Sequence, residues 1–275
     1  MAFDFKALEK TSTRAPVIEA ICFGAGGGGK SVLAGTLGGK ILYLYGGGET
    51  HGPDQAKMFC DGTIVPLRID TYENPEKNPD IALKTVQAVL EDREGIKKAG
   101  FTGVVLDSAT EVEALIRGSK AYLKKCITKD GGHNAFAEPR AVTELFRPIL
   151  SALRDLADEG VHYVVTCALD VKTLDDESGG LLECIPKLST YSVAETIVLQ
   201  FPDVLAIGPM IHPKTGEKQH RLQFNADVTK VSKDASGNIK KFVNFNPRIC
   251  GVVKTQAHMK ADLKEVLKLK KEAKK

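Results

Sequence analysis

The sequence predicts an α/β protein whose centre is a mostly parallel, doubly wound sheet, with antiparallel strands at its C-terminal edge. Two observations support this fold class. Over the first two thirds of the chain, short apolar runs alternate with segments of helical spacing, and strands that alternate with helices pair in parallel through right-handed crossovers. From about residue 196 the pattern changes to closely spaced strand pairs, which predicts the antiparallel edge.

The expected elements follow one another regularly along the chain. Core strands are predicted at 17–23, 41–45, 103–107 and 162–169, and helices at 79–99, 111–126 and 139–159. Later strands are predicted at 196–201, 204–208, 221–231 and 240–245, with a hairpin turn at 234–238. We therefore expect one domain over 1–253, with its core at about 17–208 and strand pairs at about 197–249, then a basic, helical tail at 254–275. The strand pairs could complete the core sheet or form a docking surface.

Composition excludes several classes of protein. No apolar run reaches 18 residues, and the N-terminus, MAFDFKALEK, lacks the features of a signal peptide, so we expect a cytoplasmic protein without membrane contacts. The six cysteines show neither a CxxC pair nor zinc-ligand spacing, which predicts reduced thiols. A formal net charge of +3 is too small to indicate nucleic-acid binding by itself.

Residues 24–31, GAGGGGKS, have the pattern of a phosphate-binding loop, and they stand between a predicted strand and a predicted helix. Glycines let successive N–H groups face phosphate oxygens, the lysine reaches the β and γ phosphates, and the serine binds magnesium. A flexible linker would not be expected to end in Gly-Lys-Ser at this place. The pattern predicts nucleotide contacts from Gly24, Ala25, Gly26, Gly27, Gly28, Gly29, Lys30, Ser31 and Val32.

Polar residues also end the neighbouring strands. Asp107 ends the predicted strand at 103–107 and is expected to be the second magnesium ligand beside Ser31, either directly or through a bound water. Glu49 comes just after the strand at 41–45, and it is either the group that activates water or a solvated loop acid. Because the carboxyl ends of parallel strands line one crevice, we expect these residues to converge on the phosphate loop. Lys30, Glu49 and Thr166 are the predicted catalytic residues, with Thr166 as a sensor of the γ phosphate.

Four features, in this order along the chain, resemble the RecA-like P-loop ATPases. They are GAGGGGKS, Glu49 after a strand, VVLDS at 104–108 and VVTCAL at 164–169. The size and layout are similar to phage-encoded AAA-type nucleotide-binding proteins of that superfamily, which include ATP-dependent single-strand annealing proteins. The resemblance covers about residues 17–208. It implies ATP and Mg²⁺ as cofactors, ATP hydrolysis, and the host cytoplasm as location. It also implies a homo-oligomer with nucleotide near the subunit interface, where Lys187 or Arg140 could complete a neighbour's site.

The resemblance further implies two loops that bind single-stranded DNA, at about 128–137 and 170–186. The first offers a mixture of basic and aromatic side chains: Lys124, Lys125, Lys129, His133 and Phe136. The second is acidic, which argues against contact with DNA phosphates there. At Ala168 the chain also departs from relatives that often carry a polar residue.

Two functions follow from these expectations. The first is a Mg-ATP-dependent ATPase that acts on single-stranded DNA in phage recombination or strand annealing. The alternative is an ATP-dependent assembly or regulatory switch that binds a protein partner and no DNA. A small-molecule kinase would need an arginine-rich lid, and the region after residue 169 contains none.

Overall fold

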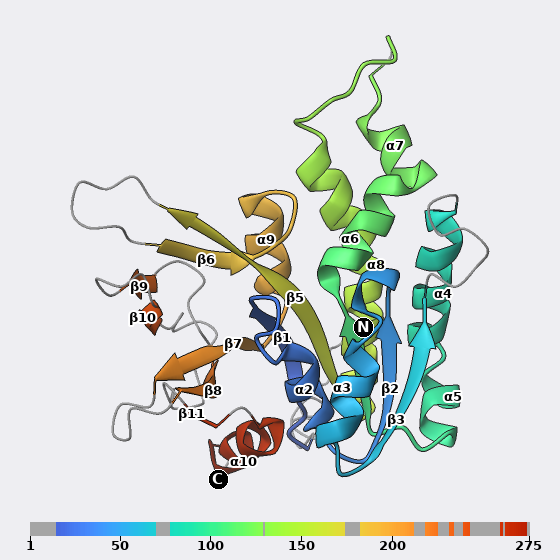
Figure 1. The fold of residues 1–275 in the computed structure, drawn as a ribbon. Helices are drawn as coiled ribbons and strands as arrows, with labels where there is room; N and C mark the ends of the chain where they lie inside the picture. Colours follow the sequence, from blue (N-terminus) through green and yellow to red (C-terminus); the bar gives the residue numbers. More distant parts are fainter. Residues whose placement is uncertain are drawn as a thin grey trace, which may run out of the picture.

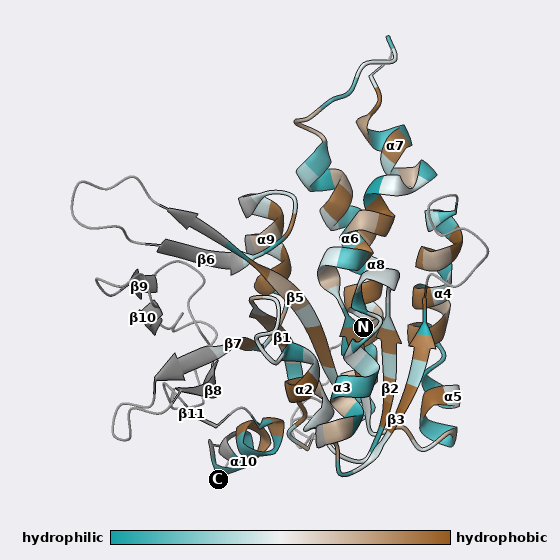
Figure 2. Cartoon of the chain, viewed as in Figure 1, coloured by the Kyte–Doolittle hydropathy of each residue, from teal (hydrophilic) through white to brown (hydrophobic). Residues whose placement is uncertain are grey.

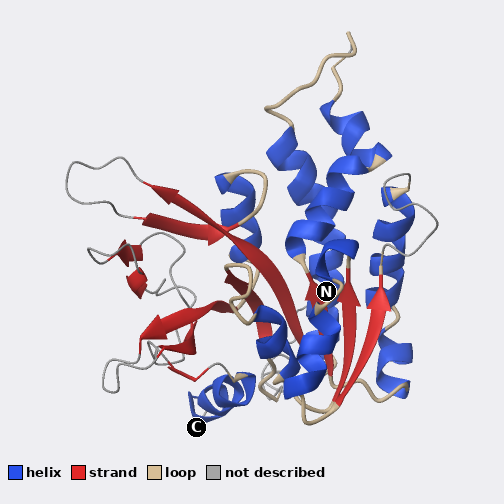
Figure 3. Cartoon of the chain, in the orientation of Figure 1, coloured by secondary structure: helices blue, strands red, loops and turns tan. Residues whose placement is uncertain are grey.

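The structure is a computed structural model that describes residues 15–69, 78–128, 130–173, 182–211, 218–224, 231–233, 239–242, 259–260 and 262–273. Its centre is a sheet of six parallel strands in the order β3-β2-β4-β5-β1-β7 (Figures 1 and 3). These strands are β1 (Glu19–Gly24), β2 (Lys40–Tyr45), β3 (Thr63–Arg68), β4 (Gly103–Asp107), β5 (His162–Thr173) and β7 (Asp203–Ile211). The α/β architecture predicted from the sequence is therefore confirmed.

Helices cover both faces of this sheet. On one face lie α4 (Pro79–Glu91), α5 (Arg93–Lys98), α6 (Ala109–Gly118), α7 (Lys120–Cys126), α8 (Glu138–Asp158) and α9 (Tyr191–Val198). On the other lie α2 (Lys30–Gly35), α3 (Gly52–Phe59) and α10 (Leu263–Ala273). Successive strand residues point to opposite faces, so Phe23 packs in the first layer and Cys22 in the second. The strands between the layers are accordingly apolar (Figure 2).

Shorter strands run antiparallel outside the six-stranded part. They are β6 (Leu182–Pro186) against the outer half of β5, β8 (Lys218–Phe224) against β7, β11 (Met259–Lys260) against β8, and the pair β9 (Val231–Lys233) and β10 (Ile239–Phe242). The predicted hairpin turn at 234–238 lies outside the described residues. β7 itself joins the sheet in parallel with β1, so the expected antiparallel pairing within 196–208 is wrong.

The cause of that error is a helix in a β-branched sequence. Residues 196–201, TIVLQF, look like a strand, yet Thr196 to Val198 end α9. The apolar positions Val193, Ala194, Ile197 and Val198 recur at helical spacing and are all buried on one face. Packing against α8 therefore outweighs the weak strand preference of the residues.

Two other element boundaries differ from the predictions. The helix expected at 79–99 is broken at Asp92, whose carboxylate accepts a hydrogen bond from the Gly95 N–H at 3.0 Å and begins α5. Ser119 separates α6 from α7 in the same way, since its hydroxyl accepts from the Tyr122 N–H at 3.2 Å. The edge strand β3 and helix α3 were not predicted.

The lysine-rich C-terminal segment forms α10, which packs beneath α2 (Figure 1). Leu263 and Val266 are buried in the same apolar cluster as Leu33 of α2. The Leu263 N–H also donates to the Thr36 hydroxyl, at 2.9 Å. Among the described residues, no helix combines the length and the apolar character needed to span a membrane.

Candidate nucleotide-binding site

The phosphate loop joins β1 to α2 through residues 25–29. Gly27 and Gly29 have φ values of 69° and 91°, which favour glycine because a Cβ would strain the backbone. The Gly28 N–H donates to the Ala25 carbonyl at 2.9 Å and closes the turn. A Cβ on Gly24 would lie only 2.4 Å from the backbone oxygen of Ile207, so glycine also lets the loop lie against β7.

Lys30 folds back over this loop. Its Nζ donates to the carbonyl oxygens of Gly24 at 3.0 Å and Ala25 at 3.1 Å. These contacts hold the ammonium group above the loop backbone rather than letting it extend into solvent. The positive charge of Lys30 therefore lies next to the backbone of the loop.

Asp107 lies beside the first turn of α2, at the carboxyl end of β4. It is fully buried, and its carboxylate accepts hydrogen bonds from three side chains. Ser31 Oγ lies 3.3 Å from Oδ2, the Tyr43 hydroxyl donates to the same oxygen, and the Thr166 hydroxyl donates to Oδ1. These hydroxyls come from α2, β2 and β5, so the order of the strands assembles the cluster.

Glu49 ends the short 3₁₀ turn η1 (Gly47–Glu49) that follows β2. Partial burial and the nearby charge of Asp107 raise the pKa of its carboxyl, while Lys30 lowers it and Glu111 adds a smaller upward shift. Glu111 lies against this turn, because a Cβ on Gly48 would meet its Oε1 at 2.3 Å. A carboxylate with a raised pKa is a stronger base than an exposed glutamate.

The structure thus brings together most of the predicted site residues. Lys30 and Ser31 of the loop lie with Asp107 and Thr166, and Glu49 is within electrostatic reach of Lys30 and Asp107. The Thr166 hydroxyl is bonded to Asp107, and this contact was not part of the expected sensor role.

Sequence reasoning missed three residues of the site: Tyr43, Gly52 and Glu111. Tyr43 stands in an apolar strand and reads as a core residue. Gly52 begins α3 and lies so close to the cluster that a Cβ there would be 2.6 Å from Oδ2 of Asp107. Of the three, only Glu111 could have been recognised from the sequence, because it is an acidic residue one helical turn after the predicted magnesium ligand.

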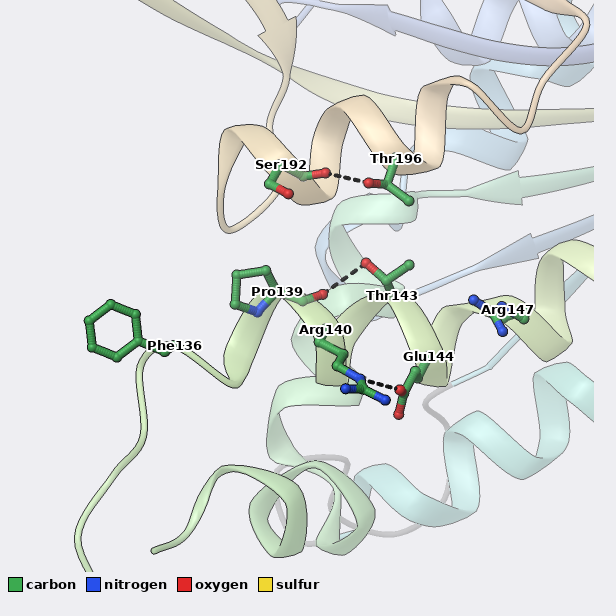
Figure 4. Close-up of a pocket in the computed structure, with 8 residues that line it drawn as sticks. All are labelled: Phe136, Pro139, Arg140, Thr143, Glu144, Arg147, Ser192 and Thr196. Carbon is green, nitrogen blue, oxygen red and sulfur yellow. Dashed lines mark hydrogen bonds and ion pairs between the residues drawn. The ribbon is translucent and has the colours of Figure 1, made fainter.

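A second feature is a groove between α8 and α9 with a volume of about 510 Å³ (Figure 4). Its lining residues are Phe136, Pro139, Arg140, Thr143, Glu144, Arg147, Ser192 and Thr196. It continues along α8 to Arg154 and past the end of α9 to Gln200. Arg140, Arg147 and Arg154 are seven residues apart, so they recur every two turns, about 10.5 Å, along one side of α8.

The charge of this groove is mainly positive. Glu144 is the acid in its lining, and it is paired with Lys125 and with Arg140, both at 2.7 Å. These hydrogen bonds lower the pKa of Glu144 to about 2, so it stays ionised and neutralises one cation. Within the described part of the chain, the exposed Arg147 has no acidic partner. Arg154 donates to the side chain and backbone of Gln200.

Lys124, Lys125, His133 and Phe136, the predicted DNA-contacting residues that the structure describes, lie on α7 and the loop after it, away from the phosphate loop (Figure 1). Phe136 is 98% exposed and stands at the end of the groove, where Figure 4 shows its ring directed outward. His133 is paired with Glu138. Lys124 is in the last turn of α7, and Lys129 lies outside the described residues.

Neither models of known protein families nor the sequences of curated proteins gave a match to this chain.

Proposed function

We propose that this chain is a Mg-ATP-dependent ATPase of the RecA-like P-loop class that acts on single-stranded DNA in recombination or strand annealing. The observation that carries the nucleotide part is one cluster: a glycine loop with Lys30 folded over it, and Ser31 3.3 Å from the buried carboxylate of Asp107. A hydroxyl and a carboxylate oxygen at this spacing are the hard oxygen donors that Mg²⁺ prefers.

The space beside two glycines of the loop is open. A Cβ on Gly26 or Gly27 would meet no atom within 4 Å, so the space above these residues is open, and both are exposed. Backbone N–H groups of such a loop and the Lys30 ammonium would bind the phosphates, and Ser31 and Asp107 would hold the cation. A bound Mg²⁺ supplies charge stabilisation to the phosphoryl group during transfer.

Glu49 is the residue proposed to orient and deprotonate the attacking water. Its carboxyl lies near the charges of both Lys30 and Asp107, and its raised pKa makes it a stronger base than an exposed glutamate. Removing this carboxylate while keeping its shape should therefore affect hydrolysis more than binding.

The groove between α8 and α9 supports the choice of DNA. A strand of nucleic acid offers regularly spaced phosphates, and the arginines of α8 offer cations along about 21 Å. Hydroxyls of Thr143, Ser192 and Thr196 line the same groove, and Phe136 gives an aromatic face on which a base could stack. Arginine pairs bidentately with phosphate, which suits this role.

The alternative function is an ATP-dependent switch that binds a protein partner. The exposed apolar side chains on α7 and the loop after it favour it: Leu123 is 44% exposed, Ile127 52% and Phe136 98%. A patch of this kind is common where proteins associate.

An ATPase assay with and without single-stranded DNA at low salt tests the proposal, on wild type, Lys30→Ala and Glu49→Gln. We expect wild type to hydrolyse ATP faster with DNA, and Lys30→Ala to lose ATP binding. Lys57→Ala, which removes an exposed lysine paired with Asp54, is the control for charge. Absence of ATP binding by wild type would refute the ATPase, whereas ATP hydrolysis with no DNA stimulation and no DNA binding would favour the switch.

A further inference from the structure

The buried carboxylate of Asp107 has three hydroxyl partners. Besides Ser31, two hydroxyls from neighbouring strands donate to it, one to each oxygen. Asp107, Tyr43 and Thr166 each have 0% exposure, so water does not compete for these bonds. A carboxylate in this position is stable only if its lone pairs are satisfied, and the three hydroxyls do this.

Tyr43 lies between Asp107 and the β2 strand that carries it, and it shares one oxygen of Asp107 with Ser31. Its hydroxyl binds Oδ2, the oxygen that also faces Ser31. β2 pairs with β4 so that Tyr43 lies opposite Val105 and Tyr45 lies opposite Asp107, which directs the phenol along β4 toward the carboxylate.

Gly52, the first residue of α3, lies against the cluster of Asp107, Tyr43 and Ser31. A Cβ at this position would lie 2.6 Å from Oδ2 of Asp107 and 3.0 Å from the Tyr43 hydroxyl. It would also lie 3.4 Å from Ser31 Oγ. A side chain on the first residue of α3 would therefore crowd the carboxylate of Asp107 and the Tyr43 hydroxyl, and glycine leaves them undisturbed.

We propose that Tyr43 is a positioning residue for the cation of the nucleotide: its hydroxyl fixes Oδ2 of Asp107 in the orientation that faces Ser31. The proposal rests on the proposed function, since it concerns the cation bound with ATP. When Ser31 acts as a metal ligand, Tyr43 and Thr166 are the hydroxyls that continue to hold the carboxylate. Tyr43 thereby sets the concentration of Mg²⁺ that the site requires without touching the nucleotide.

The test is a Mg²⁺ titration of Tyr43→Phe, which removes one oxygen atom. Tyr45→Phe is the matched control, because Tyr45 is two residues along β2 on the same face and is not among the groups bonded to Asp107. Binding of a fluorescent ATP analogue is measured first in EDTA and then against Mg²⁺, and the thermal midpoint of each variant is recorded.

We expect Tyr43→Phe to raise the Mg²⁺ concentration for half-maximal binding about tenfold, since it removes a hydrogen bond to a charged group. Binding in EDTA should stay at the wild-type value, and Tyr45→Phe should match wild type in both measurements. An unchanged Mg²⁺ requirement in a folded Tyr43→Phe overturns this proposal alone. A wild type that binds no ATP with or without Mg²⁺ overturns the proposed function as well.

If Tyr43→Phe does not fold, the tyrosine ultraviolet difference spectrum of nucleotide-loaded wild type takes its place. Addition of Mg²⁺ should perturb this spectrum, because the phenol is bonded to the carboxylate that binds the cation. Tyr45→Phe should give the same difference spectrum. A spectrum that Mg²⁺ leaves unchanged in both proteins contradicts the assigned role.

Discussion

Lys270 of α10 forms a buried ion pair with Asp203 at the start of β7, with Nζ and Oδ2 2.5 Å apart. The side chains are 16% and 4% exposed, and Asp203 also accepts a hydrogen bond from the Glu19 N–H at 2.9 Å. The C-terminal helix is therefore joined to the two adjacent strands β1 and β7 at the end of the sheet opposite the phosphate loop.

Lys270→Ala should lower the free energy of unfolding by roughly 3 kcal/mol at pH 7, because it leaves a buried carboxylate without its cation. Burial raises the pKa of Asp203 even with Lys270 present. Asp203 therefore binds a proton more readily in the folded state than in the unfolded state. The loss of stability caused by Lys270→Ala should shrink as the pH falls through the raised pKa of Asp203, because a protonated Asp203 no longer needs a cation. Denaturant unfolding at pH 7 and pH 5 measures the difference, with the exposed neighbour Lys271→Ala as the control. A loss of stability that grows as the pH is lowered would contradict the role assigned to the Lys270–Asp203 ion pair.

Glu49→Gln should reduce kcat for ATP hydrolysis by about 10²-fold or more while ATP still binds, because an amide cannot accept the proton of water. In wild type the rate should fall as pH is lowered through the raised pKa of Glu49, hence at a higher pH than for a free glutamate. Glu111→Gln removes one of the charges that raise this pKa, so its acidic limb should move to lower pH. A pH–rate profile of the three proteins tests this, and an unchanged rate in Glu49→Gln would exclude Glu49 as the base.

Arg147→Ala should weaken binding of a short single-stranded oligonucleotide and leave basal ATP hydrolysis unchanged. If Arg147 contacts one phosphate, the slope of log K against log salt concentration should decrease by about 0.7. Arg93→Ala is the matched control, because this exposed arginine pairs with Asp155 and is not among the residues that line the groove. Equal binding by wild type and Arg147→Ala over the whole salt range would show that DNA does not use the groove.

The residues of the phosphate loop and Asp107 were predictable because their pattern has one structural meaning. A strand, a glycine loop ending in Gly-Lys-Ser and a second strand ending in aspartate meet at one edge of any parallel sheet. The pattern predicted only some of the glycines that the loop needs. It requires Gly24 and Gly29. In the structure, Gly27 also has a positive φ, and a Cβ on Gly28 would lie 2.8 Å from the Ala25 oxygen.

Tyr43 and the α8–α9 groove were not predictable for different reasons. The bond from Tyr43 to Asp107 depends on how β2 pairs with β4, and an apolar strand does not specify which strand becomes its neighbour. The groove needs α9, whose β-branched residues favour a strand when read alone. Tertiary packing decided both, and the helical spacing of the apolar residues in α9 is too short a signal to outweigh their strand preference.

The packing of α10 beneath α2 has a consequence for how the molecule is made. The Leu263 N–H and the Thr36 hydroxyl that it binds are 227 residues apart. During synthesis, the groups of the phosphate site up to Ile207 leave the ribosome well before Leu263 and Val266 can cover Leu33. The helix that carries Lys30 and Ser31 therefore gains its last apolar support only when almost the whole described chain has been translated, and a contact of such sequence separation forms slowly.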